Sequence, residues 1–330
     1  MRWPDAARIG LAGCLLATIP FLANADPLLL TATIPLGDVT GRMDHFAYDP
    51  GHMRLFLAEL GNDSVGVIDL RAMTLTQTLT GFSEPQGLGY DLTQDLLLVA
   101  NGGDGTVRRF AGDGLDPAGQ IALGTDADNI HPMPHTGQMV VGYGDGAIAV
   151  LDPAGLSVVM SVALAGHPEG FQIDPAGQRI FVNVTDAGQV AVINISTQTV
   201  VATWPLTDAL GNFPMTLDPS TGQVIIATRF PPKLLFLDAA DGTVLAQLPL
   251  CADADDVMVD DQRHRLYVSC GAGVLDVFGA GPVGYVHIAR IPTAAGARTA
   301  IFVPELDLLF VAARATGANP AAVLVFKPQG

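Results

Sequence analysis

The stretch GLGYD (87–91), LLLVAN (96–101), GTVRRF (105–110) and QIAL (120–123) contains four short apolar runs separated by turn-like segments. The run that ends at Val99 recurs with ends at Leu57, Val141, Val182, Ile226, Val268 and Val311, at spacings of 42, 42, 41, 44, 42 and 43 residues. A period of about forty residues with four strands per unit is typical of β-propeller blades. We therefore predict an all-β protein, a seven-bladed β-propeller with four-stranded blades.

Burial explains why such a repeat closes into a ring. A single four-stranded sheet cannot bury both of its apolar faces, whereas radially packed sheets cover one another and a closed ring leaves no open end. The composition agrees, because the chain is 49% hydrophobic and contains 37 glycines, which fits many buried strands and tight turns.

The first 25 residues have the pattern of a secretory signal peptide. Arg2 and Arg8 give a weakly basic start before the short apolar run 9–22, which is followed by the small-residue site Ala23-Asn24-Ala25. The rival pattern, a lipoprotein box that ends at Cys14, has too few apolar residues before it. We expect residues 1–25 to be a signal peptide, residues 26–330 to be one propeller domain, and the protein to be periplasmic or secreted. No other stretch is apolar for long enough to cross a membrane.

The last repeat is incomplete. It contains the inner strand 299–303 and the next two, 308–312 and 321–327, and then the chain stops. The segment 29–36, LLTATIPL, has the pattern of the missing outer strand. We predict that it completes the final blade, because this closure pairs two strand edges that would otherwise be exposed.

The repeats resemble those of the YVTN-type β-propeller family, seven-bladed proteins that are mostly exported by bacteria. The resemblance is carried by Val99-Ala100-Asn101, by Val182-Asn183-Val184-Thr185, by the strand 65–69 (VGVID) and by Asp-Pro turns such as Asp49-Pro50. It implies the fold and export. It does not imply an activity, because one fold hosts many functions.

The charge excludes one class of partner. The chain has 33 acidic and 16 basic residues, a formal net charge of −17. Such a surface repels nucleic acid, so we expect no nucleic-acid partner. Phosphate-loop, haem-attachment, zinc-helix and nucleophile-elbow motifs are absent from the sequence.

Two cysteines follow the signal segment, Cys251 and Cys270. The repeat register places both at the same rim, and an exported protein meets oxidising conditions. The pair forms either one disulfide or two buried free thiols.

Unusual polar residues concentrate at one face of the predicted ring. Links from an outer strand to the next inner strand, and links between the second and third strands, share this face; the other face carries routine turns. We predict a funnel there that binds a small molecule or ion through Asp44, Gln86, Asn129, Asn183, Asn212, Arg229, Arg298 and Arg314.

The carboxylates and histidines of this rim support two further hypotheses. Converging oxygen ligands suit a divalent cation, calcium, magnesium or manganese, and nearby histidines would favour zinc. We predict Asp128, Glu169, Asp255 and Asp256 as metal ligands; alternatively, these carboxylates pair with the rim arginines. Should the site be catalytic, His45, His167 and Glu169 are the candidates for proton transfer.

Three functions follow from these expectations. The first is an exported propeller that binds a small ligand or cation in an acidic, Arg-flanked axial funnel. The second is a metal-dependent hydrolase, lactonase or lyase that acts at the same funnel. The third is a scaffold that binds another exported protein through one rim.

Overall fold

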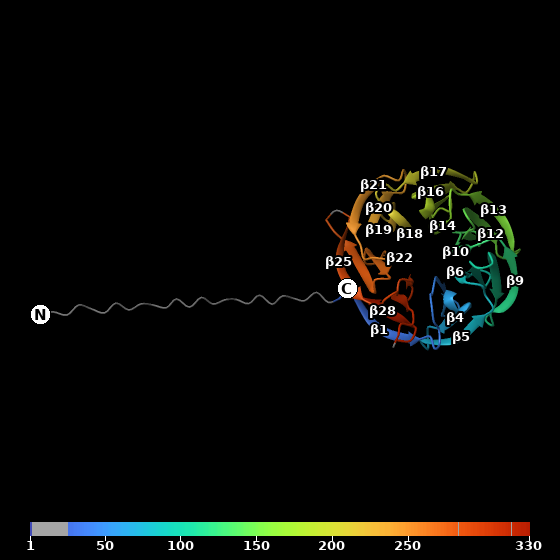
Figure 1. Ribbon diagram of the computed structural model, residues 1–330, viewed down its shortest axis with the longest axis horizontal. Helices are drawn as coiled ribbons and strands as arrows, with labels where there is room; N and C mark the ends of the chain where they lie inside the picture. Colours follow the sequence, from blue (N-terminus) through green and yellow to red (C-terminus); the bar gives the residue numbers. More distant parts are fainter. Residues whose placement is uncertain (2–25, 283, 318) are drawn as a thin grey trace.

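The computed structural model describes residues 1, 26–282, 284–317 and 319–330. Seven four-stranded antiparallel sheets are arranged as a ring around a central axis (Figure 1). The predicted all-β, seven-bladed β-propeller is confirmed. The predicted signal peptide lies outside the described residues apart from Met1, and in the described ranges no helix is long and apolar enough to span a membrane.

In each blade the first strand lies next to the axis and the fourth lies outside (Figure 1). In chain order the blades are β2–β5 (Phe46–Asp49, Arg54–Glu59, Ser64–Asp69, Thr74–Thr80), β6–β9 (Pro85–Asp91, Leu96–Asn101, Thr106–Ala111, Asp116–Ala122), β10–β13 (Ala127–Pro132, Met139–Tyr143, Ala147–Asp152, Ser157–Ala163), β14–β17 (Pro168–Ile173, Arg179–Val184, Gln189–Asn194, Thr199–Pro205), β18–β21 (Leu210–Asp218, Gln223–Phe230, Pro232–Asp238, Val244–Pro249), β22–β25 (Ala254–Asp260, Arg265–Cys270, Val274–Ala280, Tyr285–Pro292), and β26–β28 with β1 (Ala300–Val303, Leu308–Ala313, Ala322–Pro328, Leu28–Pro35).

The N-terminal strand closes the ring as predicted. β1 pairs antiparallel with β28, with Leu29 opposite Lys327 and Ile34 opposite Val323. The first strand of the chain, β1, and the last, β28, therefore lie side by side in the seventh blade. The closure removes the exposed edge that β28 would otherwise present to solvent.

The core lies between the blades rather than within one layer. Each apolar cluster joins two neighbouring blades. One contains Phe56 of the first blade and Leu97 of the second, and another contains Tyr267 of the sixth blade and Leu309 of the seventh. The cluster with Leu55 and Phe310 joins the first blade to the seventh and completes the circle. Second strands such as β3 and β7 are buried on both faces, which explains their continuous apolar runs.

Irregularities in the inner strands shape one end of the axis. The register between first and second strands shifts near the start of β6, β10, β14, β18 and β22. Such bulges turn side chains away from regular alternation. Two glycines make them possible: a Cβ on Gly87 would lie 2.0 Å from the Asp128 carbonyl oxygen, and one on Gly170 would lie 2.6 Å from that of Phe213. Only glycine permits neighbouring inner strands to approach so closely at these points.

Candidate functional site

A cavity of about 450 Å³ occupies one end of the propeller axis. It lies at the starts of the inner strands, on the face predicted from the sequence. Its polar lining includes six carboxyl groups, three arginines and three histidines: Asp44, Asp126, Asp128, Glu169, Asp255, Asp256, Arg42, Arg229, Arg298, His45, His131 and His167. A concave site with converging polar groups is the usual form of a ligand pocket.

Most of the predicted site residues meet in this cavity. Eleven line it: Asp44, His45, Gln86, Asp128, Asn129, His167, Glu169, Arg229, Asp255, Asp256 and Arg298. The bulged starts of the inner strands bring them together, which is why residues far apart in the sequence share one funnel. Their predicted roles in binding or catalysis stay predictions.

Three predicted ligand-binding residues do not line the cavity. Asn183 is fully buried and donates from Nδ2 to the carbonyl oxygens of Phe213 (3.1 Å) and Pro214 (3.2 Å). Asn212, also fully buried, donates to Asn183 Oδ1 at 3.1 Å. These amides join the fourth blade to the fifth, because buried backbone carbonyls need donors. Arg314 is exposed and lies outside the cavity lining.

Two arginines of the funnel are occupied by the protein's own carboxylates. Arg229 contacts Asp253 at 3.2 Å and Asp255 at 2.5 Å, and Arg298 contacts the same two carboxylates, each at 3.0 Å. The Arg229 guanidinium also lies 4.0 Å from the centre of the Phe213 ring. This network matches the alternative in which rim carboxylates pair with arginines. It leaves these two arginines poorly placed to hold an acidic ligand.

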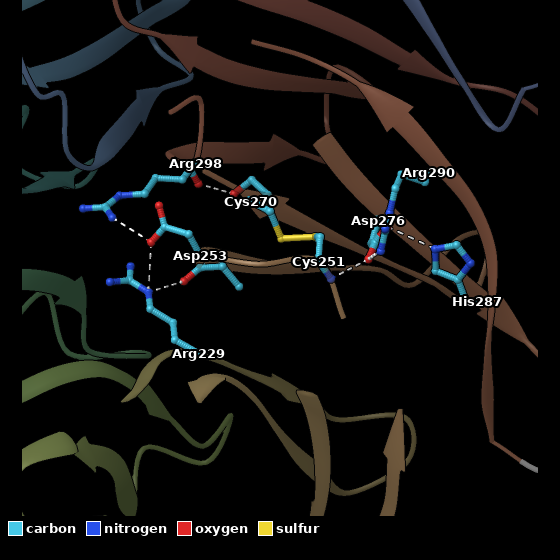
Figure 2. Close-up of a disulfide and its surroundings, with 10 residues drawn as sticks. Arg229, Cys251, Asp253, Cys270, Asp276, His287, Arg290 and Arg298 are labelled. Atoms are coloured by element: carbon cyan, nitrogen blue, oxygen red, sulfur yellow. Dashed lines mark hydrogen bonds and ion pairs between the residues drawn. A yellow bond between two sulfur atoms is a disulfide. The ribbon is translucent and has the colours of Figure 1, made fainter. Parts of the chain in front are cut away.

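A disulfide fastens this network to the frame of the sixth blade. Cys251 and Cys270 are bonded, with their Cα atoms 6.0 Å apart, so of the two sequence alternatives the disulfide is confirmed. Figure 2 shows the bond between Asp253 with its two arginines on one side and Asp276 on the other. Asp276 Oδ2 accepts the Cys251 N–H at 2.8 Å. The disulfide therefore fixes the link that carries Asp253.

Two histidines bridge carboxylates across the first, third and fourth blades. His45 Nε2 lies 3.6 Å from Asp44 and 3.9 Å from Asp128, and His167 Nε2 lies 3.6 Å from Asp128. The contact with Asp128 raises the pKa of His167 to about 9, and Nδ1 of the same ring donates to the Gly144 carbonyl at 2.7 Å. Burial opposes protonation of His45, but Asp44 and Asp128 outweigh it and raise its pKa. His167 therefore carries positive charge at neutral pH, and its two neighbouring carboxylates favour the charged form of His45 as well.

Two carboxyl groups have no such compensation. Among the described residues, Glu169 and Asp256 form no ion pair within 4.0 Å, unlike Asp44, which Arg42 contacts at 2.7 Å. Burial, reinforced by Asp128, raises the pKa of Glu169 to about 7. Burial also raises the pKa of Asp256 to about 8, although its Oδ2 accepts the Ala300 N–H at 2.7 Å. The funnel thus holds two acidic groups without an ion-pair partner within 4.0 Å, and the more distant charges of His45, His167 and Arg229 only partly offset their burial.

The floor of the cavity is apolar and was not predicted from the sequence. It is lined by Phe46, Phe171, Met215, Met258 and Phe302, together with the His131 ring. His131 packs edge-on against Phe171 with ring centres 4.7 Å apart, and burial lowers the pKa of His131 to about 4, so this imidazole is neutral at pH 7. The available signal was an apolar residue two positions after Asp44, Glu169 and Asp256.

The geometry of the funnel does not favour the predicted metal site. In the part of the chain that the structure describes, the only group of three or more His, Cys, Asp or Glu residues with ligand atoms within 4.8 Å of one another is Asp49, His52 and Asp95. That group lies in turns of the opposite face, and Asp49 Oδ2 already accepts hydrogen bonds from Arg54 at 2.8 and 3.0 Å. The set Asp128, Glu169, Asp255 and Asp256 is not brought to this spacing, so metal binding there stays a prediction.

Comparisons with known proteins support the fold and assign no activity. No protein-family model and no curated protein sequence matches the chain. A chain of the hydrazine synthase of Kuenenia stuttgartiensis is similar in structure, with a TM-score of 0.76, 18% identity, and 95% of this chain and 98% of that chain covered. A chain of the mitotic checkpoint complex has a TM-score of 0.79 and 10% identity, with 99% of each chain covered. At these identities the likeness concerns architecture alone, and the chain shares the seven-bladed β-propeller fold with both.

Proposed function

We propose that the axial funnel binds a small cationic ligand, namely an organic ammonium group. The observation that carries this proposal is the pair Glu169 and Asp256, two enclosed carboxyl groups that lack an ion-pair partner among the described residues. Burying a carboxylate without a counter-charge is costly, and a bound cation removes that cost. A ligand that carries positive charge is therefore favoured over a neutral or acidic one.

The spacing of the acidic groups favours an ammonium group over a metal ion. Glu169 starts the inner strand of the fourth blade and Asp256 that of the sixth, with Phe213 of the fifth between them. A metal ion needs several ligand atoms converging within a short radius, which the described residues of the funnel do not supply, whereas an ammonium group can be held by one or two acceptors. Arg229 and Arg298 are neutralised by Asp253 and Asp255 and do not repel such a ligand at full strength.

The resemblance to YVTN-type repeats and the Cys251–Cys270 disulfide support export to an oxidising compartment. We infer a periplasmic or secreted binding protein of that type. Its ligand would then be a small solute met outside the cytoplasm.

The test is a charge-reversed pair of ligands of the same shape. Titration calorimetry and thermal unfolding compare 2-phenylethylammonium with 3-phenylpropionate, alongside calcium, magnesium, manganese and zinc chlorides. We expect the ammonium compound alone to bind and to raise the melting temperature through mass action. Glu169→Gln and Asp256→Asn each weaken this binding, while the control Asp241→Asn, an exposed turn carboxylate on the opposite face, leaves it unchanged.

Two results would contradict the proposal. Binding of the carboxylate in place of the ammonium compound would show that the arginines select the ligand. A stabilising divalent cation with no effect of either organic ion would favour the metal-dependent hydrolase, lactonase or lyase. If no probe binds and another exported protein is retained by the intact rim, the scaffold alternative gains.

A further inference from the structure

The cavity has two layers. Its charged residues, among them Asp44, Glu169, Asp256 and Arg298, form a collar at the starts of the inner strands, and the residues of the apolar floor follow them along the chain. The same chain segments build both layers, because Asp44 is followed two residues later by Phe46, Glu169 by Phe171, and Asp256 by Met258. The layers are therefore a property of the inner strands rather than an accident of one loop.

The spacing of two residues fixes the geometry. Successive side chains of a regular strand point to opposite faces, so Asp256 and Met258, which follow the register shift of β22, point the same way and lie about 6–7 Å apart along the strand. In β14 the register shift between Pro168 and Phe171 interrupts this alternation, and Phe171 turns into the core between blades. When one group of a ligand contacts Glu169 and Asp256 in the collar, the apolar floor therefore lies about one side-chain length from that group, further along the axis. Met215 extends the floor onto the fifth blade, and Phe302 extends it onto the seventh.

Two side chains of the floor, Met258 and Phe302, present apolar surface to the cavity, whereas Phe46, Phe171 and Met215 are buried in the clusters between blades and border the cavity behind them. Met258 and Phe302 are each only half-buried, so apolar surface faces the empty space. Methionine side chains adapt to the shape of a partner and make favourable contacts with aromatic rings. Displacing water from this apolar surface by an apolar group of a ligand is favourable. A ligand with charge alone would leave that surface uncovered.

We propose that the ligand is an amphipathic amine, with its ammonium group at Glu169 and Asp256 and an aromatic or branched apolar body on the floor formed by Phe46, Phe171, Met215, Met258 and Phe302. This inference rests on the proposed cation site and adds the chemistry of the rest of the ligand. The cavity of about 450 Å³ matches a ligand of this kind, since pockets for small molecules start at about 300 Å³.

The experiment separates the two layers. Titration calorimetry compares 2-phenylethylammonium with ethylammonium, which carries the same charge without the ring, on the full chain. Burial of one phenyl ring predicts about ten- to a hundredfold tighter binding of the aromatic amine. Two floor variants, Met258→Gln and Phe302→Leu, lower this ratio severalfold without changing the affinity for ethylammonium. The matched control Phe230→Leu alters an exposed phenylalanine outside the cavity lining and leaves the ratio unchanged.

The outcomes are distinguishable. A ratio near one, or a ratio that neither floor variant changes, overturns the two-layer inference while the cation site stands. If neither amine binds, the cation site itself is contradicted and the inference falls with it. A lowered ratio in both floor variants with unchanged unfolding temperatures supports the proposal, because it rules out loss of folding as the cause.

Discussion

Asp256→Asn should stabilise the ligand-free protein at pH 8 and have little effect near pH 4. Burial raises the pKa of Asp256 from an ordinary value of 3.8 to about 8 in the folded chain. Between these values the folded state binds the proton more strongly than the unfolded state, so the free energy of unfolding falls as pH rises through this window. Asparagine retains an oxygen that can accept the Ala300 N–H and does not titrate, so the variant avoids this loss.

The size of the effect follows from the shift. Each pKa unit corresponds to about 1.4 kcal/mol, which sets an upper limit of about 6 kcal/mol across the window. Because Asp256 faces a cavity that water can enter, we expect about half of that, about 2–3 kcal/mol. The assay is urea unfolding of both proteins at pH 5 and pH 8, read as the change with pH in the difference between their free energies of unfolding.

Asp241→Asn is the control, since hydrogen bonds from Thr243 lower the pKa of this exposed carboxyl. Its contribution has the opposite sign: it is present at high pH and is lost on acidification. The reasoning would be refuted if Asp256→Asn were as destabilising at pH 8 as at pH 5. That result would mean that Asp256 is ionised and compensated in the folded protein.

The other predictions concern protons, the disulfide and the opposite face. Binding of 2-phenylethylammonium should be tighter at pH 8 than at pH 6 and should release protons, because a bound cation lowers the pKa values of Glu169 and Asp256 from about 7 and about 8. Calorimetry in two buffers of different ionisation enthalpy measures the proton release. Equal apparent binding enthalpies in the two buffers would contradict the prediction. Replacing Cys251 and Cys270 by serine should lower the free energy of unfolding by about 2–4 kcal/mol. It should also weaken ammonium binding, because the link that carries Asp253 is no longer fixed. A loss of stability with unchanged affinity would limit the disulfide to a structural role. Arg54→Met should cost about 3–5 kcal/mol in urea unfolding at pH 7, because it leaves the fully buried Asp49 without its main partner, and a cost below 1 kcal/mol would contradict this account.

Much of the architecture could be predicted from the sequence because the repeated apolar runs correspond directly to buried strands. Second strands such as 96–101 are covered on both faces by neighbouring blades, which produces the regular apolar runs. The closing strand could be predicted from the missing outer strand of the last blade. The predicted bounds 29–36 differ from the observed Leu28–Pro35 by one residue at each end.

The site could be predicted less completely. The repeat register placed Glu169 and Asp256 at one rim, but it could not distinguish residues that line the axis from residues that join blades. Asn183 and Asn212 occupy rim positions in sequence, yet they turn toward buried carbonyl groups between the fourth and fifth blades. The apolar floor was missed because Met258 and Phe302 cannot be told from ordinary core residues in the sequence until the inner strands are seen around the axis.

A crystal structure of the protein with 2-phenylethylammonium at pH 8 tests the central claim most directly. The account predicts the ammonium nitrogen within hydrogen-bond distance of Glu169 and Asp256 and the phenyl ring against Met258 and Phe302. Ligand bound with its ring outside the mouth, or an ammonium group bound away from both carboxylates while the funnel holds only water, would contradict it.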